Sequence, residues 1–166
     1  MNGKLFTRPH NPDRMVKLIG LISDRDEVQR IYNFIKAHPL DYPNYADWTE
    51  KCRRQLELEE KGAIYETYDT KVIGCIVYQQ HREDRHCIEI KNFRVDPNYR
   101  KKGVGTRLEF RICSIARASH LHKVYVDVSP INHDMVTFLL KKGYILEAKE
   151  PLYICNRIEL MFSKYL

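Results

Sequence analysis

A basic, glycine-containing loop that opens a helix constrains the fold of this chain more than any other segment. Residues 87–95 alternate like a strand, residues 96–98 (Asp-Pro-Asn) predict a turn, and residues 103–119 have the apolar spacing of a helix. A helix N-terminus exposes unpaired N–H groups and partial positive charge, so it binds phosphate. Gly103 and Gly105 allow a ligand close to the backbone. Three cations precede them: Arg100, Lys101 and Lys102. The segment therefore predicts a pyrophosphate-binding strand–loop–helix unit.

The spacing of the glycines narrows the choice of ligand. No segment matches the P-loop pattern, and Leu108 stands where a dinucleotide loop needs its third glycine. The remaining pattern, Arg100-x-x-Gly103-x-Gly105, resembles the acyl-coenzyme A loop of the GNAT superfamily of N-acetyltransferases. A second segment, Asn132 followed by residues 138–144 (FLLKKGY), looks like that family's second cofactor motif. The resemblance covers roughly residues 83–162, and a surface glycine turn that only caps a helix is the alternative.

The rest of the chain reads as alternating strands and helices. Helices are predicted at residues 23–38, 46–61, 103–119 and 132–142, the second of them closed by Gly62. Strands are predicted at residues 16–22, 63–68, 71–80, 87–95, 124–128, 144–148 and 153–162. Asp69-Thr70 joins the second and third strands as a hairpin.

This order of elements predicts one α/β domain around a mixed sheet. The resemblance implies a GNAT-like, mostly antiparallel, twisted sheet of about seven strands flanked by about four helices. We expect residues 1–13 to form a flexible arm and residues 14–166 to form the N-acetyltransferase domain.

Composition limits the class of protein. The net charge of +6 reflects either solubility or an anionic macromolecular partner. Five cysteines without a C-x-x-C pair indicate reduced core thiols, and no run of residues is apolar enough to span a membrane. The polar N-terminus is unlike a signal peptide. We expect a cytoplasmic protein without a membrane partner.

The resemblance implies how acetyl-coenzyme A would bind. Its pantetheine arm would pair with the backbone of Phe93, Arg94 and Val95, and Asn132 would bond the arm from the other side. The pyrophosphate would sit on the amides of the loop, which are those of Arg100, Lys101, Lys102, Gly103, Val104, Gly105 and Thr106.

The chemistry requires a base for the attacking amine and a donor for the leaving sulfur. Glu89 is the candidate base, directly or through water, because strict alternation places it on the face of Lys91, Phe93 and Val95. Burial would then raise its pKa. A surface ion pair with Lys91 or Arg94 is the alternative. Leu139 replaces the tyrosine that many family members use as the acid. Three other tyrosines are candidates: Tyr99, Tyr125 and Tyr144, the last of which we expect in the core.

The acceptor site is expected between the first two helices, their loop and the last hairpin. An aromatic and acidic stretch there suits a cationic amine: His38, Asp41, Tyr42, Tyr45, Asp47 and Trp48. Packing of Tyr45 and Trp48 against the core is the alternative. The identity of the acceptor, the length of the acyl group and homodimer formation stay open.

Other functions compete with this hypothesis. One is a coenzyme A-binding sensor without turnover, in line with Leu139. Another is a basic nucleic-acid-binding module that uses Arg94, Arg107 and the loop cations, although no nucleic-acid motif is present. His120, His122 and His133 do not form a zinc pattern, so no metal is expected. A nucleophilic Cys87 or Cys155 is a weaker alternative.

Overall fold

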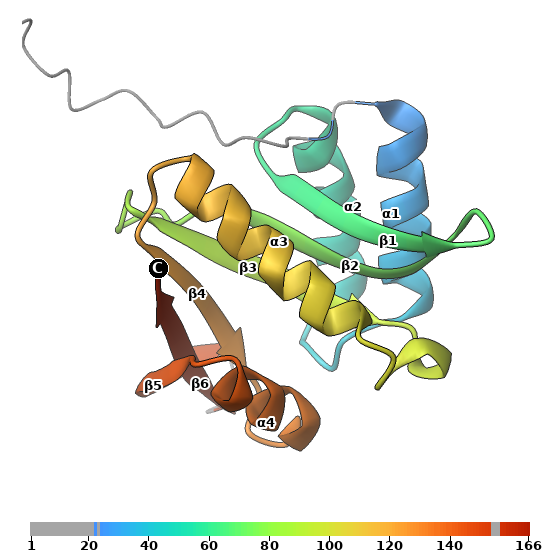
Figure 1. Ribbon diagram of the computed structural model, residues 1–166. Coiled ribbons are helices and arrows are strands. Elements are labelled where there is room, and N and C mark those ends of the chain that lie inside the picture. The colour runs from blue at the N-terminus through green and yellow to red at the C-terminus, as the bar shows by residue number, and fades with distance from the viewer. Residues whose placement is uncertain (1–21, 23, 154–156) are drawn as a thin grey trace, which may run out of the picture.

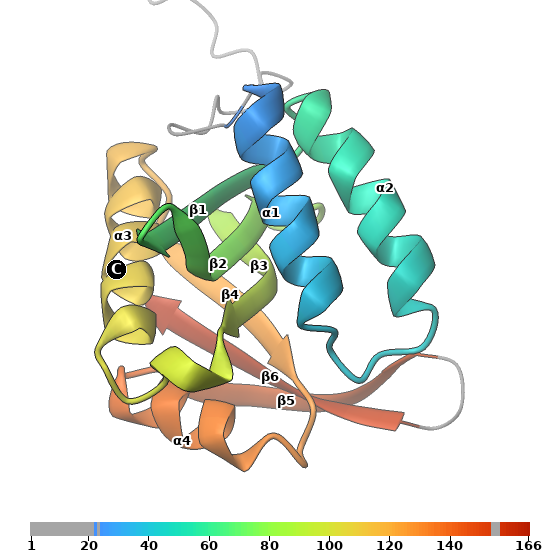
Figure 2. The same cartoon turned by 90° about the vertical axis from the view of Figure 1, so that its right-hand side faces the viewer.

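A six-stranded mixed sheet with helices on both faces forms the body of the protein. The computed structural model describes residues 22, 24–153 and 157–166 (Figure 1). The strand order is β1-β2-β3-β4-β6-β5, and of the strand pairs in these residues only β3 and β4 run parallel to each other. Helices α1 (Arg25–Ala37) and α2 (Tyr45–Glu57) cover one face of the sheet, and α3 (Val104–Ala118) covers the other (Figure 2). Each face therefore has its own apolar core.

The first two helices begin and end for local reasons. Asp24 caps α1 because its carboxylate accepts from the amides of Asp26 and Glu27, and the helix stops just before Pro39. Helix α2 ends at Glu57, four residues earlier than predicted. Gly62, predicted to close this helix, is instead the first residue of β1 (Gly62–Tyr68). A Cβ at Gly62 would lie 2.4 Å from Cζ of Tyr78, so glycine is needed there for packing.

The predicted hairpin is confirmed. Strand β1 pairs with β2 (Lys71–Gln80) across the two-residue loop Asp69-Thr70. Both loop residues have positive φ, 47° and 65°, as in the primed turns that fit the twist of two-residue hairpins.

The other elements follow the predicted order. They are β3 (Cys87–Val95), a 3-10 turn η1 (Pro97–Tyr99), α3, β4 (Lys123–Val128), α4 (His133–Lys141), β5 (Ile145–Tyr153) and β6 (Arg157–Tyr165). The mixed, mostly antiparallel sheet is thus confirmed, with six strands in the described residues instead of about seven. The predicted strand at 16–22 lies outside the described residues except for buried Ile22, and so does the predicted arm at 1–13.

Four cysteines lie in the core as predicted: Cys52, Cys75, Cys87 and Cys113 are buried and unpaired. Burial raises the pKa of each thiol, that of Cys87 to about 12. Cys155 lies outside the described residues. Within the described part of the chain, no helix is long and apolar enough to cross a bilayer.

The contact of Gly62 with Tyr78 gives a test of the packing. We expect Gly62→Ala to destabilise the protein by about 1–3 kcal/mol, because the new Cβ would overlap the ring of Tyr78, which is fully buried. Urea unfolding measures this change.

A matched control is Gly105→Ala. Gly105 lies in α3, and a Cβ on it would make an ordinary contact of 3.6 Å with the Phe138 side chain of α4. That variant should be neutral or up to about 1 kcal/mol more stable. Equal stability of the two variants would contradict the assigned packing of Gly62.

Candidate functional site

Strands β3 and β4 separate part-way along their length. Their parallel pairing runs from Cys87–Lys123 to Ile90–Val126 and ends there in the described residues, although both strands continue. The amide of Asp96 donates to the carbonyl of Ile73 on β2 at 2.9 Å. Antiparallel strands alternate the direction of their backbone groups, so those of Phe93 and Val95 point away from β2 into the gap. The gap therefore offers a free strand edge to an extended ligand.

A β-bulge at Lys91 sets the faces of β3. Tyr78 pairs with Ile90 and Val77 pairs with Asn92, which leaves Lys91 as the extra residue. Before the bulge, Ile88 and Ile90 face the core under α3; after it, Phe93 and Val95 do. Asn92 and Arg94 therefore face α1 and α2. The expectation that Glu89 shares a face with Phe93 and Val95 was wrong, because strict alternation does not survive the bulge.

The predicted loop has the conformation that its glycines require. Gly103 is the N-cap of α3 with φ +82° and no side-chain cap. The amides of Val104, Gly105 and Thr106 have no hydrogen-bond partner within the described residues. Asp96 accepts from the amide of Asn98 and fixes the preceding turn. The helix N-terminus therefore presents three N–H donors to an anion.

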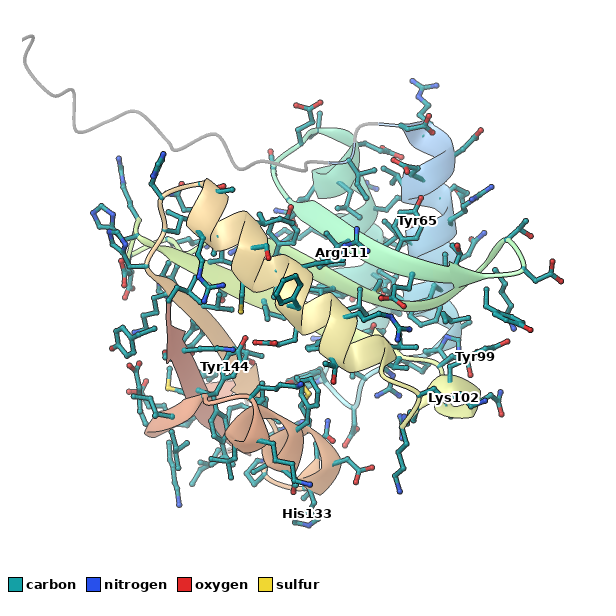
Figure 3. All side chains as sticks on the ribbon, viewed as in Figure 1. Tyr65, Tyr99, Lys102, Arg111, His133 and Tyr144 are labelled. Carbon is teal, nitrogen blue, oxygen red and sulfur yellow. The ribbon has the colours of Figure 1, made fainter. Side chains whose placement is uncertain are left out.

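A cavity of about 390 Å³, which we call the loop cavity, lies beside these amides. The residues that line it include Phe93, Arg94, Val95, Arg100, Lys101, Gly103, Gly105, Thr106, Asn132 and Phe138. Lys102 lies instead over the ring of Tyr99, where Figure 3 shows the two side chains on the turn before α3. Val104 is buried under the loop.

Helix α4 closes the loop cavity from the other side. Asn132 caps the helix by accepting from the amide of Met135 at 3.2 Å. Phe138 packs edge-on against Phe93 with ring centroids 5.6 Å apart, and a Cβ on Gly105 would lie 3.6 Å from it. The two predicted motifs therefore meet across the gap.

A second cavity, of about 490 Å³, lies on the α1 and α2 side, and we call it the acceptor-side cavity. Its lining includes Tyr42, Tyr45 and Trp48 from the predicted aromatic stretch, together with Asp41, Lys91, Asn92, Asp127 and Arg157. It shares Phe93, Arg94, Asn132 and Met135 with the loop cavity. His38 and Asp47 do not line it; His38 lies 3.8 Å from Asp96 instead.

Glu89 lies outside the lining of both cavities. Its carboxylate accepts from Lys91 Nζ and from Gln79 Nε2, each at 2.7 Å. Burial alone would raise the pKa of Glu89, but the Lys91 ammonium and the Gln79 amide lower it below its ordinary value. The direction is opposite to the one expected from the sequence.

The three tyrosines considered as donors lie away from both cavities, and Tyr144 lies in the core as expected. Leu139 is fully buried in the core, and Tyr144 is buried there too, with 2% of its surface exposed. Figure 3 labels Tyr144 below α3. Tyr99 and Tyr125 do not line either cavity. Tyr42 and Tyr45 do line the acceptor-side cavity. Burial, followed by the charges of Asp127 and Glu159, raises the pKa of Tyr42, so its hydroxyl keeps its proton at neutral pH.

Sequence reasoning missed three polar groups of the acceptor-side cavity. Asn92 and Asp127 read as strand residues, and the available signal was that Asp127 stands as a charge between Val126 and Val128 in an apolar strand. Arg157 comes from β6, where its Nε lies 2.6 Å from the buried carboxylate of Glu159 and its guanidinium lies over the Tyr42 ring. No local pattern relates these residues.

The histidines of the described ranges belong to no group of three potential metal ligands. His86 and His122 stack with ring centroids 5.6 Å apart, and His133 lies at the start of α4 (Figure 3).

The buried Lys61 gives a pH-dependent test of the polar network behind Glu89. Its ammonium hydrogen-bonds Gln79, and burial lowers its pKa to about 8. Between pH 8 and the ordinary value of 10.5, the unfolded chain binds more protons at this site, so the contribution of Lys61 to stability rises with pH. Subtracting the unfolding free energy of Lys61→Met from that of the parent should give a difference that increases across this window. A flat or falling difference would contradict the assigned environment.

The model of the Acetyltransferase (GNAT) family matches residues 26–144. No relative was found among curated proteins.

Solved structures share the fold. A candidate GNAT acetyltransferase from Desulfovibrio desulfuricans has a TM-score of 0.75 at 14% identity, covering 87% of this chain and 95% of that one. Ard1 from Thermoplasma volcanium has a TM-score of 0.69 at 22% identity, covering 86% and 93%. A candidate streptothricin acetyltransferase from Bacillus anthracis, solved with acetyl coenzyme A, has a TM-score of 0.59 at 18% identity, covering 64% and 63%. With the family model matching most of its length, the chain belongs to the GNAT family of acetyltransferases.

Proposed function

We propose that this protein transfers the acetyl group of acetyl-coenzyme A to the nitrogen of a primary amine. The observation that carries the proposal is the meeting of two cavities at the free edge of β3. Both cavities are lined by Phe93, Arg94, Asn132 and Met135. A donor in one cavity and an acceptor in the other would therefore meet beside these four residues.

The loop cavity fits acetyl-coenzyme A. The unpaired amides of Val104 to Thr106, with Arg100 and Lys101, would hold the pyrophosphate. The backbone groups of Phe93 and Val95 would pair with the pantetheine arm. The backbone of Arg94 faces β2, so we assign it a side-chain role instead. The side-chain oxygen of Asn132 already caps α4, so its side-chain NH2 group remains available to the pantetheine arm. When bound, acetyl-coenzyme A supplies the acetyl group as a thioester.

The transfer forms a nitrogen–carbon bond and breaks the carbon–sulfur bond. The amine gives up a proton, and the sulfur leaves as a thiolate that takes one up. We propose Asp127 as the proton acceptor because it lines the acceptor-side cavity one residue beyond the last β3–β4 pair. Glu89 would hold the Lys91 side chain in place at the edge of the acceptor-side cavity. Tyr42 is the proposed donor in place of Leu139.

The alternatives are weaker on specific grounds. A sensor without turnover would not need a second cavity against the first. For nucleic acid, Arg107 is already engaged by Glu66 at 2.7 Å, and Lys102 lies over Tyr99. Four free buried thiols support a reducing, cytoplasmic location.

Binding of acetyl-coenzyme A is the first test. Isothermal titration should show binding by the parent and a loss of at least about tenfold in affinity for Gly103→Glu, because the new carboxylate opposes the pyrophosphate at the helix N-terminus. Arg100→Glu should do the same without altering the N-cap.

Ala118→Glu is the matched control, since it places the same charge at the last residue of α3. It should bind like the parent. A folded parent that does not bind acetyl-coenzyme A would overturn the proposed function.

A pair of isosteric variants tests the proton acceptor. We expect Asp127→Asn to lower kcat for the best amine by about 100-fold or more, as for loss of a general base. Glu89→Gln should have a smaller effect, because it releases Lys91 without removing a group from the cavity wall. The measurement is thiol release as a function of pH, with acetyl-coenzyme A affinity as control. A larger loss in Glu89→Gln would return the role of base to Glu89.

A further inference from the structure

Two neighbouring side chains on β3 carry buried polar atoms without partners. Asn92 and Arg94 lie two residues apart after the bulge, face α1 and α2, and line the acceptor-side cavity. Within the described residues, Asn92 Oδ1 and Arg94 Nε have no hydrogen-bond partner. Residues two apart on one strand face lie about 7 Å apart, so one small molecule can contact both.

The orientation of the Asn92 amide is fixed by Tyr45. The Tyr45 hydroxyl donates to the carbonyl of Ile35 at 3.3 Å, so it accepts from Asn92 Nδ2 at 2.9 Å. The oxygen of Asn92 is therefore the atom left over. Asn92 is only 2% exposed, and a buried amide oxygen without a donor is destabilising. A ligand N–H would satisfy it.

Arg94 is a half-buried cation without an acidic partner. One of its terminal nitrogens donates to the carbonyl of Pro39 at 3.1 Å, and no carboxylate in the described residues forms an ion pair with it. The other two cations that line the acceptor-side cavity are paired with carboxylates, Lys91 with Glu89 and Arg157 with Glu159. A desolvated guanidinium favours an anion, and its planar fork matches a carboxylate.

We propose that the acceptor is a free amino acid, with its amine on the Asn92 carbonyl and its carboxylate on the Arg94 guanidinium. This inference rests on the proposed function and names its substrate class. The Asn92 carbonyl can accept a hydrogen bond from an amine, and the Arg94 cation beside it can pair with a carboxylate. The two groups together are complementary to a molecule that carries an amine and a neighbouring carboxylate. The rings of Tyr42 and Trp48 and the side chain of Pro43 form an apolar wall for the substrate's side chain.

The position of Arg94 favours the acceptor over the phosphates of the cofactor. Its guanidinium is bound to the loop between α1 and α2, whereas α3 packs on the opposite face of β3, where Gly105 lies close to Val95. Arg100, which lines only the loop cavity of the two, remains for the pyrophosphate.

Matched acceptors test the inference. Leucine, leucinamide and isopentylamine share a side chain but differ in the carboxylate, and phenylalanine, phenylalaninamide and phenethylamine form a second series. For the parent we expect kcat/KM about tenfold or more higher for the amino acid than for its amide, the effect of one charged hydrogen-bonded contact. This ratio should approach one in Arg94→Gln and stay partly in Arg94→Lys. Arg117→Gln, an exposed cation in the last turn of α3, should keep the parent's ratio.

Asn92 gives a different signature. Asn92→Leu should lower kcat/KM about tenfold for every member of a series without changing the ratio, because it removes the contact with the amine that all share. Tyr45→Phe should lower it less, through KM, since it frees the amide to turn. Acetyl-coenzyme A affinity should stay close to that of the parent in all these variants.

A binding measurement separates this inference from the proposed function. In protein labelled with ¹⁵N-arginine and saturated with coenzyme A, leucine should shift the Nε resonance of Arg94, assigned with Arg94→Lys, and leucinamide should not. Equal use of amides and amino acids, or no leucine-dependent shift, overturns the amino-acid acceptor while acetyl-coenzyme A binding still supports an acetyltransferase. A loss of acetyl-coenzyme A affinity in Arg94→Gln with an unchanged ratio would assign Arg94 to the cofactor instead.

Discussion

The parallel pairing of β3 with β4 is short, and the geometry of the site follows from where it ends. Four residue pairs join these strands, and each strand then follows its other neighbour, β3 staying with β2 and β4 with β6. The sheet consequently divides into two halves that diverge from one seam (Figure 1). A wedge of this kind exposes backbone groups inside a protein, and such groups are stabilised only by a partner. The pantetheine arm of the proposed cofactor, which is extended and bears amides, would be such a partner.

The bulge at Lys91 determines which chemistry meets at the seam. A regular strand would have turned Asn92 into the core under α3 and Phe93 toward the helices α1 and α2. The extra residue instead places aromatic and aliphatic side chains beside α3 and α4, and polar ones beside α1 and α2. One backbone irregularity thus places apolar side chains on the side of the loop cavity and polar side chains on the side of the acceptor-side cavity.

Local features were predictable from sequence, and features that depend on pairing were not. The hairpin at Asp69-Thr70, the loop at Gly103 and the short helix that begins next to Asn132 each depend on a few adjacent residues, so their patterns sufficed. The position of Glu89 depends on a register shift against β2, which no pattern in β3 records. Arg157 reaches the site from β6, and only the folded sheet brings it beside Tyr42. Gly62 looked like a helix end, but the Tyr78 ring requires it.

The wall of four residues shared by the two cavities has a consequence for how such a protein changes over generations. Phe93, Arg94, Asn132 and Met135 each line both cavities, so a substitution at one of them that reshapes the acceptor-side cavity can also reshape the loop cavity. Effects of substitutions at such positions do not add. Diversification of the acceptor is therefore easiest at positions that line the acceptor-side cavity alone and have no proposed part in proton transfer, such as Trp48 and Arg157, and the four shared residues restrict the order in which changes can accumulate.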